Sequence, residues 1–180
     1  MKGGRIFIWV EGVSDARFFT AVMKPFFEKS YTQVEIRTYA NLKREKFSRI
    51  LQAVQAIQAD YLVVADIDSE PCVTAKKKCI GQRLTEVDPE RIRVVIQEIE
   101  SWYLAGLDET GFAELGLSPV DRTDAVTKED FIAVMPREYD SRIDFMMEIL
   151  KRFSISAAVR KNGSLSYFMS KQGFVITGER

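Results

Sequence analysis

Short apolar segments alternate with amphipathic segments along the first part of the chain. Residues 5–10 and 60–65 are almost continuously apolar, as expected for strands that are buried on both faces. Residues 33–39 alternate apolar and polar side chains, which is the two-residue period of a strand. A fourth apolar run covers residues 91–96. The pattern therefore predicts about four strands.

The segments between these strands have the period of helices. Residues 14–28 and 46–58 carry apolar side chains about every 3.6 residues, and residues 74–82 form a short basic segment. Another helix is predicted to open within residues 97–104, directly after the fourth strand. This alternation predicts an α/β fold with a Rossmann-like parallel sheet and helices on both faces.

The pattern changes after residue 106. Helical segments at 110–115, 128–135 and 141–153 alternate with turns rich in Pro, Gly and Asp, and no central strand is predicted. We therefore expect an α/β core over residues 1–106 and a mostly helical C-terminal extension over residues 107–180, packed on the core.

Composition places the chain among ordinary globular proteins. The chain has 180 residues, of which 46% are hydrophobic, enough for a substantial core. No apolar stretch has the length of a membrane span, and the N-terminal run is too short for a signal peptide, so we expect a cytoplasmic protein with no membrane partner. Cys72 and Cys79 are predicted to be free thiols, because a reducing cytosol disfavours a disulfide.

The chain contains no histidine. This excludes Ser-His-Asp and Cys-His nucleophilic catalysis, histidine general bases and most zinc hydrolase sites. Any catalysis must use carboxylates, lysines, hydroxyls and a metal that prefers oxygen ligands. The 26 basic and 26 acidic residues balance, so nucleic-acid binding would depend on local patches, such as residues 43–49 or 76–83.

Acidic residues follow two of the predicted strands. Glu11 and Asp15 come after the first strand, and Asp66 and Asp68 come after the third. Because the carboxyl ends of parallel strands form the ligand-binding edge of an open sheet, these side chains are expected to converge. Carboxylates this close would repel one another without a divalent cation, so the pattern favours a Mg²⁺ or Mn²⁺ site. The alternative is that the acids cap turns and helix starts.

Glu98 and Glu100 follow the fourth strand with the same spacing of two. They are either further metal ligands or acids at the start of a helix, where the helix dipole favours them. If they bind metal, the site has ligands for two cations. Glu11, Asp15 and Asp66 would hold one, and Asp68 with Glu98 or Glu100 would hold the other.

Two of these motifs resemble the signature of the TOPRIM domain, which is shared by topoisomerases, DnaG-type primases, recombination mediators and OLD-family nucleases. The resemblance covers about residues 5 to 105 and is greatest to the OLD-type branch and the small stand-alone proteins related to it. It implies that Glu11, Asp66 and Asp68 bind metal, with Asp15, Glu98 and Glu100 as further ligands. The motifs are Val10-Glu11-Gly12-Val13-Ser14-Asp15 and Val64-Ala65-Asp66-Ile67-Asp68.

Three functions are compatible with these residues. The first is a metal-dependent nuclease, in which Glu11 relays a proton, Asp66 and Asp68 bind metal, and Lys43 neutralises charge in the transition state. The second is a TOPRIM-like module that binds metal or nucleic acid without cleavage, within a repair, defence or replication complex. The third is a phosphatase with an aspartyl nucleophile. The expected partner is DNA or RNA, together with a protein partner or a second copy of the chain.

Overall fold

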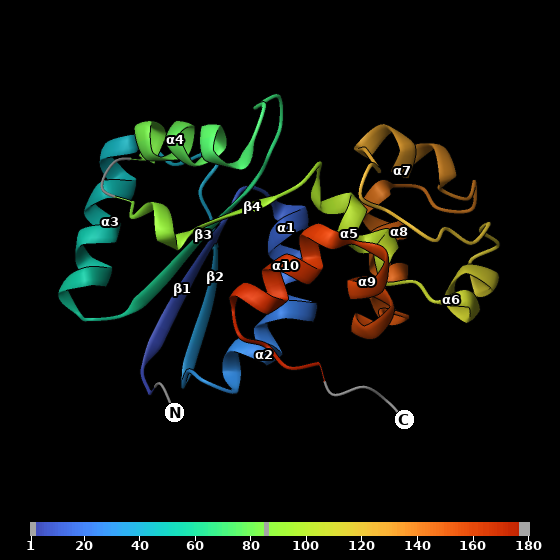
Figure 1. Cartoon of the computed structure of the whole chain (residues 1–180), viewed down its shortest axis with the longest axis horizontal. Coiled ribbons are helices and arrows are strands. Elements are labelled where there is room, and N and C mark those ends of the chain that lie inside the picture. The colour runs from blue at the N-terminus through green and yellow to red at the C-terminus, as the bar shows by residue number, and fades with distance from the viewer. Residues whose placement is uncertain (1–2, 85–86, 177–180) are drawn as a thin grey trace. The chain divides into compact units, whose positions relative to one another are not determined.

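The predicted strands form a four-stranded, all-parallel sheet in the first half of the chain, which confirms the α/β fold class (Figure 1). The strands are β1 (Arg5–Val10), β2 (Gln33–Thr38), β3 (Asp60–Asp66) and β4 (Ile92–Val95). The structure, a computed structural model, describes residues 3–84 and 87–176. Almost every residue of β1 and β3 is buried, as their continuous apolar runs predict.

The order of the strands, β2-β1-β3-β4, places β1 and β3 at the centre. Ile8 of β1 pairs with Ile36 of β2 on one side and with Leu62 of β3 on the other. The chain thus leaves β1 toward one edge of the sheet and then crosses to the other side of β1. In doubly wound folds such a reversal opens a crevice at the carboxyl ends of the two central strands, where ligands bind. The acidic motifs follow these two strands.

Helices cover both faces of the sheet. Figure 1 shows α3 (Arg44–Ala56) and α4 (Val73–Leu84) on one face, with α1 (Val13–Phe18) and α2 (Lys24–Glu28) on the other. The α3 and α4 face packs as one aromatic and aliphatic cluster, in which the ring centroids of Trp9 and Phe47 are 5.1 Å apart. Its buried members from the helices are Phe47, Leu51, Val54, Ile80 and Leu84.

The helix predicted over residues 14–28 is interrupted. A π-helical segment, Phe19–Met23, separates α1 from α2. Pro25 explains the interruption, because it has no N–H to donate to the carbonyl of residue 21 and its ring crowds that carbonyl. The wider π turn accommodates both effects without ending the helix. The apolar face survives, with Phe18, Phe19 and Phe27 all buried.

The chain divides into two compact units, Met1–Val95 and Ile96–Arg180. The second unit is helical, as predicted, and its core is α5, a helix whose residues are all buried and which packs against three others. Two of its helices, α9 and α10, fall in residues for which the sequence predicted no element. Its helices are α5 (Ile99–Ala105), α6 (Glu109–Glu114), α7 (Lys128–Val134), α8 (Arg142–Lys151), α9 (Ile155–Lys161) and α10 (Gly163–Lys171). The sequence-based boundary after residue 106 stays a prediction.

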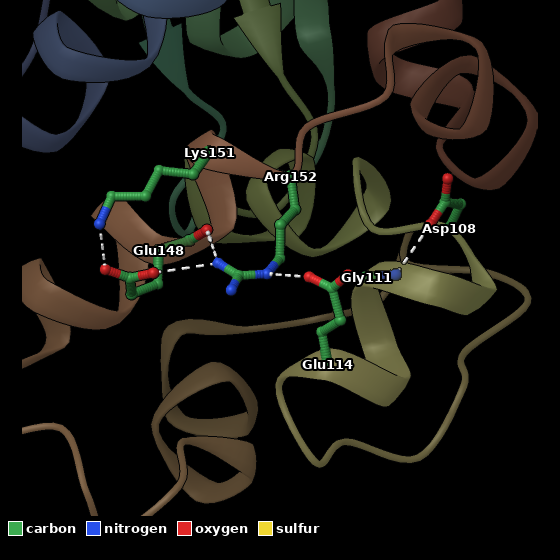
Figure 2. Close-up of polar contacts among 6 residues, drawn as sticks. All are labelled: Asp108, Gly111, Glu114, Glu148, Lys151 and Arg152. Atoms are coloured by element: carbon green, nitrogen blue, oxygen red, sulfur yellow. Dashed lines mark hydrogen bonds and ion pairs between the residues drawn. The ribbon is translucent and has the colours of Figure 1, made fainter.

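Polar side chains tie the helices of the second unit together (Figure 2). Arg152, the residue after α8, donates to Glu114 of α6 at 2.7 Å and to Glu148 of α8 at 3.0 Å. Asp108 caps α6 by accepting the backbone N–H of Gly111 at 2.8 Å, and Lys151 pairs with Glu148. These contacts fix the orientation of α6 and α8.

Two further predictions concern the chain as a whole. Within residues 3–84 and 87–176, no helix is long and apolar enough to cross a membrane. Both cysteines are free thiols, as predicted, with Cys72 exposed and Cys79 half-buried.

Candidate functional site

Glu11 lies directly after β1, at the carboxyl edge of the sheet. Its side chain is 29% exposed, and its Oε1 lies 3.7 Å from Nη1 of Arg83. The other oxygen, Oε2, is buried and has no hydrogen-bond partner within the described residues. A buried carboxylate oxygen without a donor is costly, because it has lost water and gained nothing in return. Oε2 of Glu11 is therefore an atom that a water molecule, another hydrogen-bond donor or a cation would satisfy.

Asp15 lies in the first turn of α1 and is buried, with 5% of its surface exposed. Its Oδ2 accepts the backbone N–H of Gly12 at 3.0 Å, a contact that fixes the turn between β1 and α1. This is the helix-start role that the sequence left open for Asp15, because an acid in the first turn favours the positive end of the helix dipole. The contact uses one carboxylate oxygen and does not test the predicted metal role.

Asp66 is the last residue of β3, beside Val95 of β4 in the register. The chain turns immediately afterwards, with the Ile67 N–H donating to the carbonyl of Val95 at 2.9 Å. Asp68 then adopts a left-handed backbone conformation, with φ of 49°. Aspartate tolerates this conformation better than most residues, although it costs about 1–2 kcal/mol relative to glycine. The loop therefore places two aspartates at the edge of the sheet in a strained but defined turn.

The side chain of Tyr39 lies near three of the predicted metal ligands, Glu11, Asp15 and Asp66. Its ring is fully buried, and its hydroxyl donates to the carbonyl of Val64 at 3.3 Å. Burial raises the pKa of this hydroxyl above its ordinary value. Three nearby negative charges raise the pKa further, while the guanidinium of Arg83 lowers it. The three charges belong to Glu11, Asp15 and Asp66. The three carboxylates thus lie near enough to this hydroxyl to act on it electrostatically, Glu11 from directly after β1, Asp15 from the first turn of α1 and Asp66 from the end of β3.

Two cations of α4 contact the predicted metal ligands, and the sequence did not single them out as site residues. Lys76 forms an ion pair with Asp68, and Arg83 lies beside Glu11. Lys76 is unusual because it is only 5% exposed, whereas the side chain of Asp68 is 53% exposed. The sequence does contain a pattern that could have indicated the burial of Lys76. Lys76 takes the place of an apolar residue in the buried stripe that continues with Ile80 and Leu84.

Arg83 is held by three contacts. Its Nη2 donates to the carbonyl of Ala40 at 3.1 Å, its guanidinium lies 5.7 Å from the centre of the Tyr39 ring, and its Nη1 approaches Glu11. Arg83 thus joins α4 to the loop that follows β2 as well as to the acidic edge.

Lys43, the predicted transition-state cation, is the N-cap residue of α3 and is exposed. Its carbonyl accepts the N–H of Phe47 at 3.0 Å. The role assigned to Lys43 stays a prediction, whereas Lys76 and Arg83 form ion pairs with the predicted ligands Asp68 and Glu11.

Glu98 and Glu100 belong to the second unit, where each has a partner. Oε2 of Glu98, the N-cap residue of α5, accepts the backbone N–H of Lys128 at 2.5 Å. Glu100 is 3% exposed, and its Oε1 lies 2.5 Å from Nη1 of Arg142. Burial raises the pKa of Glu100 above its ordinary value, although a backbone hydrogen bond and Arg142 oppose the shift. Both acids therefore have structural contacts, and their predicted metal roles stay predictions.

Within the described ranges, 3–84 and 87–176, no three acidic or thiol side chains are placed so that they could hold a metal ion together. This includes the three carboxylates near Tyr39, those of Glu11, Asp15 and Asp66. Binding an ion would require their side chains to rotate toward a common centre.

Comparison with known proteins adds one structural likeness. No family model matches the chain, and no curated protein matches it. Among solved structures, the chain is similar to the C-terminal region of the Burkholderia pseudomallei OLD protein, with 14% sequence identity and a TM-score of 0.38. The similarity covers 92% of this chain and 97% of that chain. A likeness of this degree assigns neither a family nor a function to the chain.

Proposed function

We propose that this chain carries out metal-dependent phosphodiester chemistry on nucleic acid, as a nuclease that uses Mg²⁺ or Mn²⁺. One observation supports the proposal above all others. Glu11 directly follows β1 and Asp66 ends β3, and these two strands pair with each other at the centre of the sheet, with Asp15 nearby in the first turn of α1. These strands flank the crevice where doubly wound sheets bind ligands.

The donor atoms suit a hard divalent cation. Carboxylate oxygens are the ligands that Mg²⁺ prefers, and the chain has no histidine that would favour zinc. The buried Oε2 of Glu11, which has no hydrogen-bond partner in the described residues, is an atom that a cation would satisfy. We propose Glu11, Asp15 and Asp66 as ligands, with Asp68, Glu98 and Glu100 as further ligands.

The proposed residues would have different roles in the hydrolysis of a phosphodiester. A bound divalent cation would activate water and stabilise the oxygen that leaves the phosphorus. Glu11 would relay the proton from that water. Asp66 and Asp68 would hold metal. Lys43 would neutralise the charge that builds up on the phosphoryl oxygens.

A basic surface on α3 favours nucleic acid over a small phosphate ester as the substrate. Lys43, Arg44, Lys46 and Arg49 are exposed at the start of this helix, where Glu45 is the one acid among them. Arg44 and Arg49 also line a surface hollow of about 350 Å³. On a chain with no net charge, such a local excess of positive charge would attract the phosphate backbone of a nucleic acid.

The second candidate is a module that binds metal or nucleic acid without cleaving it. The ion pairs of Lys76 with Asp68 and of Arg142 with Glu100 favour this alternative, because they neutralise predicted ligands without a metal.

The experiment is a cleavage assay in three conditions, Mg²⁺, Mn²⁺ and EDTA, with supercoiled plasmid, linear duplex, single-stranded DNA and structured RNA as substrates. The nuclease proposal expects cleavage with metal and none with EDTA, and a loss of at least about a hundredfold in Asp66→Asn, because a metal ligand is removed. Glu28→Gln, at an exposed acid at the end of α2, is the matched control and should cleave normally.

Retarded but intact nucleic acid in the presence of metal would support the binding module instead. Metal-dependent release of phosphate from p-nitrophenyl phosphate, with no effect on any nucleic acid, would support the phosphatase and contradict the proposal.

A further inference from the structure

The solvent-facing side of α3 carries an arginine on each of its two edges. Arg44, Ser48 and Gln52 follow one another at intervals of four residues and form one row along the helix, and Glu45 and Arg49 form the neighbouring row. These five side chains line the hollow of about 350 Å³. The two arginines are about 140° apart around the helix and about 7.5 Å apart along it, so Ser48 and Gln52 lie between them.

The polar groups around this hollow suit a phosphate group. A guanidinium group binds phosphate oxygens through two parallel N–H donors, and the hydroxyl of Ser48 and the amide of Gln52 are further donors. Glu45 is the one acid that lines the hollow, and its charge opposes an anion there. Positive charge nevertheless prevails, since Lys43 and Lys46 are exposed on the same turns of the helix.

The shape of the surface favours double-stranded DNA among the nucleic acids. Proteins that bind single strands stack the bases on aromatic rings, and the one aromatic residue of α3, Phe47, is fully buried in the core. An α-helix with its side chains is about 10–12 Å across, and the major groove of B-form DNA, about 12 Å wide, admits it. The major groove of double-stranded RNA is too narrow for side chains to enter.

This surface begins at the edge of the sheet where the acids lie. The last residue of β2, Thr38, pairs with Val10 of β1, and a short loop then leads into α3. In that loop the N–H of Ala40 donates to the carbonyl of Glu11 at 3.2 Å, and the carbonyl of Ala40 accepts from Arg83 at 3.1 Å. A duplex held along α3 therefore passes close to the carboxyl ends of the strands.

We propose that the exposed face of α3 binds the phosphate backbone of double-stranded DNA, with Arg44 and Arg49 each contacting a phosphate. The inference rests on the proposed function, for which it names the substrate class and the surface that holds it. Contacts to phosphates position a protein without reading the bases, so binding through this face is independent of DNA sequence. Glu45 limits the affinity of the surface.

The test measures binding by fluorescence anisotropy in EDTA, over a series of salt concentrations, with two short labelled DNA duplexes of unrelated sequence. The natural protein should bind both duplexes equally. Arg44→Gln and Arg49→Gln should each weaken binding roughly tenfold at low salt, and each should reduce the slope of log K against log salt by about 0.9, the value for one lost phosphate contact. Arg44→Lys keeps the charge and should retain the slope.

Glu45→Gln is the variant with the opposite expected sign. Removing this negative charge from the hollow should tighten binding roughly threefold, a gain that misfolding cannot produce. Glu28→Gln and Lys29→Gln are the matched controls, because they change the same charges at exposed positions at the end of α2, on the opposite face of the sheet (Figure 1). Both controls should bind as the natural protein does. Thermal unfolding of each variant checks that the fold is retained.

The ligand is tested with three competitors, namely single-stranded DNA, double-stranded RNA and vesicles that contain phosphatidylserine. Duplex DNA should bind most tightly. Tighter binding of either other nucleic acid would overturn the assignment to duplex DNA. Tighter binding of the vesicles would show that the surface serves a membrane, and would overturn it as well.

The same variants separate this inference from the function on which it rests. If the natural protein cleaves nucleic acid with metal while Arg44→Gln and Arg49→Gln bind duplex DNA normally, the α3 surface is wrong and the nuclease stands. If both variants lose binding and no metal supports cleavage, the surface stands and the nuclease is wrong. If the natural protein binds no duplex DNA in EDTA, the inference is overturned, whatever the cleavage assay shows.

Discussion

Arg142 at the start of α8 donates to Glu100 in the first turn of α5 across 2.5 Å, and the carboxylate that it reaches is almost entirely buried. The ion pair joins α8 to α5, at Glu100, which the sequence predicted to be a metal ligand. The contribution of this ion pair to the free energy of unfolding can be measured without any metal.

We predict that Arg142→Met lowers the free energy of unfolding by about 1–3 kcal/mol, because it leaves a buried carboxylate without its partner. The partial exposure of Arg142 places the effect below the largest values known for buried pairs. Urea unfolding checks this. The double variant Glu100→Leu/Arg142→Met should regain most of the loss, since an apolar pair leaves no charge buried. If Glu100 also binds metal, Glu100→Gln will weaken Mn²⁺ binding in addition to its effect on stability.

Gln58 ends α3 in a left-handed conformation, with φ of 54°. Its N–H donates to the carbonyl of Gln55, and the N–H of Ala59 donates to that of Val54, which is the bonding pattern that usually places glycine here. We predict that Gln58→Gly raises the free energy of unfolding by about 0.5–1 kcal/mol, because relief of the strained backbone exceeds the added entropy of the unfolded chain. Gln55→Gly, within the same helix, should lower it by about 1 kcal/mol. Equal effects at both positions would refute the conformational explanation.

Asn162 is fully buried, and its side chain makes three hydrogen bonds. Its amide group donates to Ser101 at 3.3 Å and to Thr123 at 3.1 Å, and its carbonyl oxygen caps α10 by accepting the N–H of Leu165 at 2.9 Å. We predict that Asn162→Ala costs about 2–3 kcal/mol of stability, through the lost cap and the hydroxyls left behind.

The conservative variant Asn162→Asp keeps the oxygen that caps α10 and replaces the amide donor with an acceptor. It should retain α10 in circular dichroism while still losing stability. A fully stable Asn162→Asp would show that the two donated bonds contribute nothing.

Glu148 makes the stability of the second unit depend on pH. Its contacts with Lys151 and then Arg152 hold the pKa of its carboxyl below the ordinary value of 4.5. A carboxyl whose pKa is lowered by folding stabilises the protein above the pKa of its unfolded form, and this contribution disappears as the pH falls through the folded value. We therefore expect the natural protein to melt at a higher temperature than Glu148→Gln at pH 7. The difference should shrink below pH 4.5. A difference that is constant with pH would mean that packing, not charge, is responsible.

Much of the fold could be predicted because it depends on patterns along the chain. The continuous apolar runs of β1 and β3 predicted strands buried on both faces, and the helical period predicted α3, while α4 was predicted as a short basic helix over residues 74–82. The order of the strands could not be predicted, because it depends on the side of each strand to which the crossover connection carries the chain. The helices α9 and α10 were missed because they are short and mix small and polar residues, so burial of Ala157, Ala158 and Leu165 becomes evident only in three dimensions.

The candidate site was predictable in part. The strand pattern predicted that Glu11 and Asp66 would follow strand ends, whereas the structure shows that these two strands are neighbours. The cations that meet the acids could not be assigned, because many lysines and arginines were available and pairing depends on the direction in which α4 returns across the sheet. Lys76 was the exception in principle, since a charge within an otherwise apolar helical stripe requires a partner of opposite charge.

The central position of β1 and β3 also sets the order in which the acidic edge can assemble during folding. The ends of β1 and β3, which carry Glu11 and Asp66, come together only after the chain has passed through β2 and two crossover connections, a closure that is slow for any protein with parallel strands. Lys76 is only eight residues from Asp68 and can reach it as soon as α4 begins to form. A chain emerging from the ribosome would therefore neutralise Asp68 early, and bring the ends of β1 and β3 side by side only when the sheet is complete.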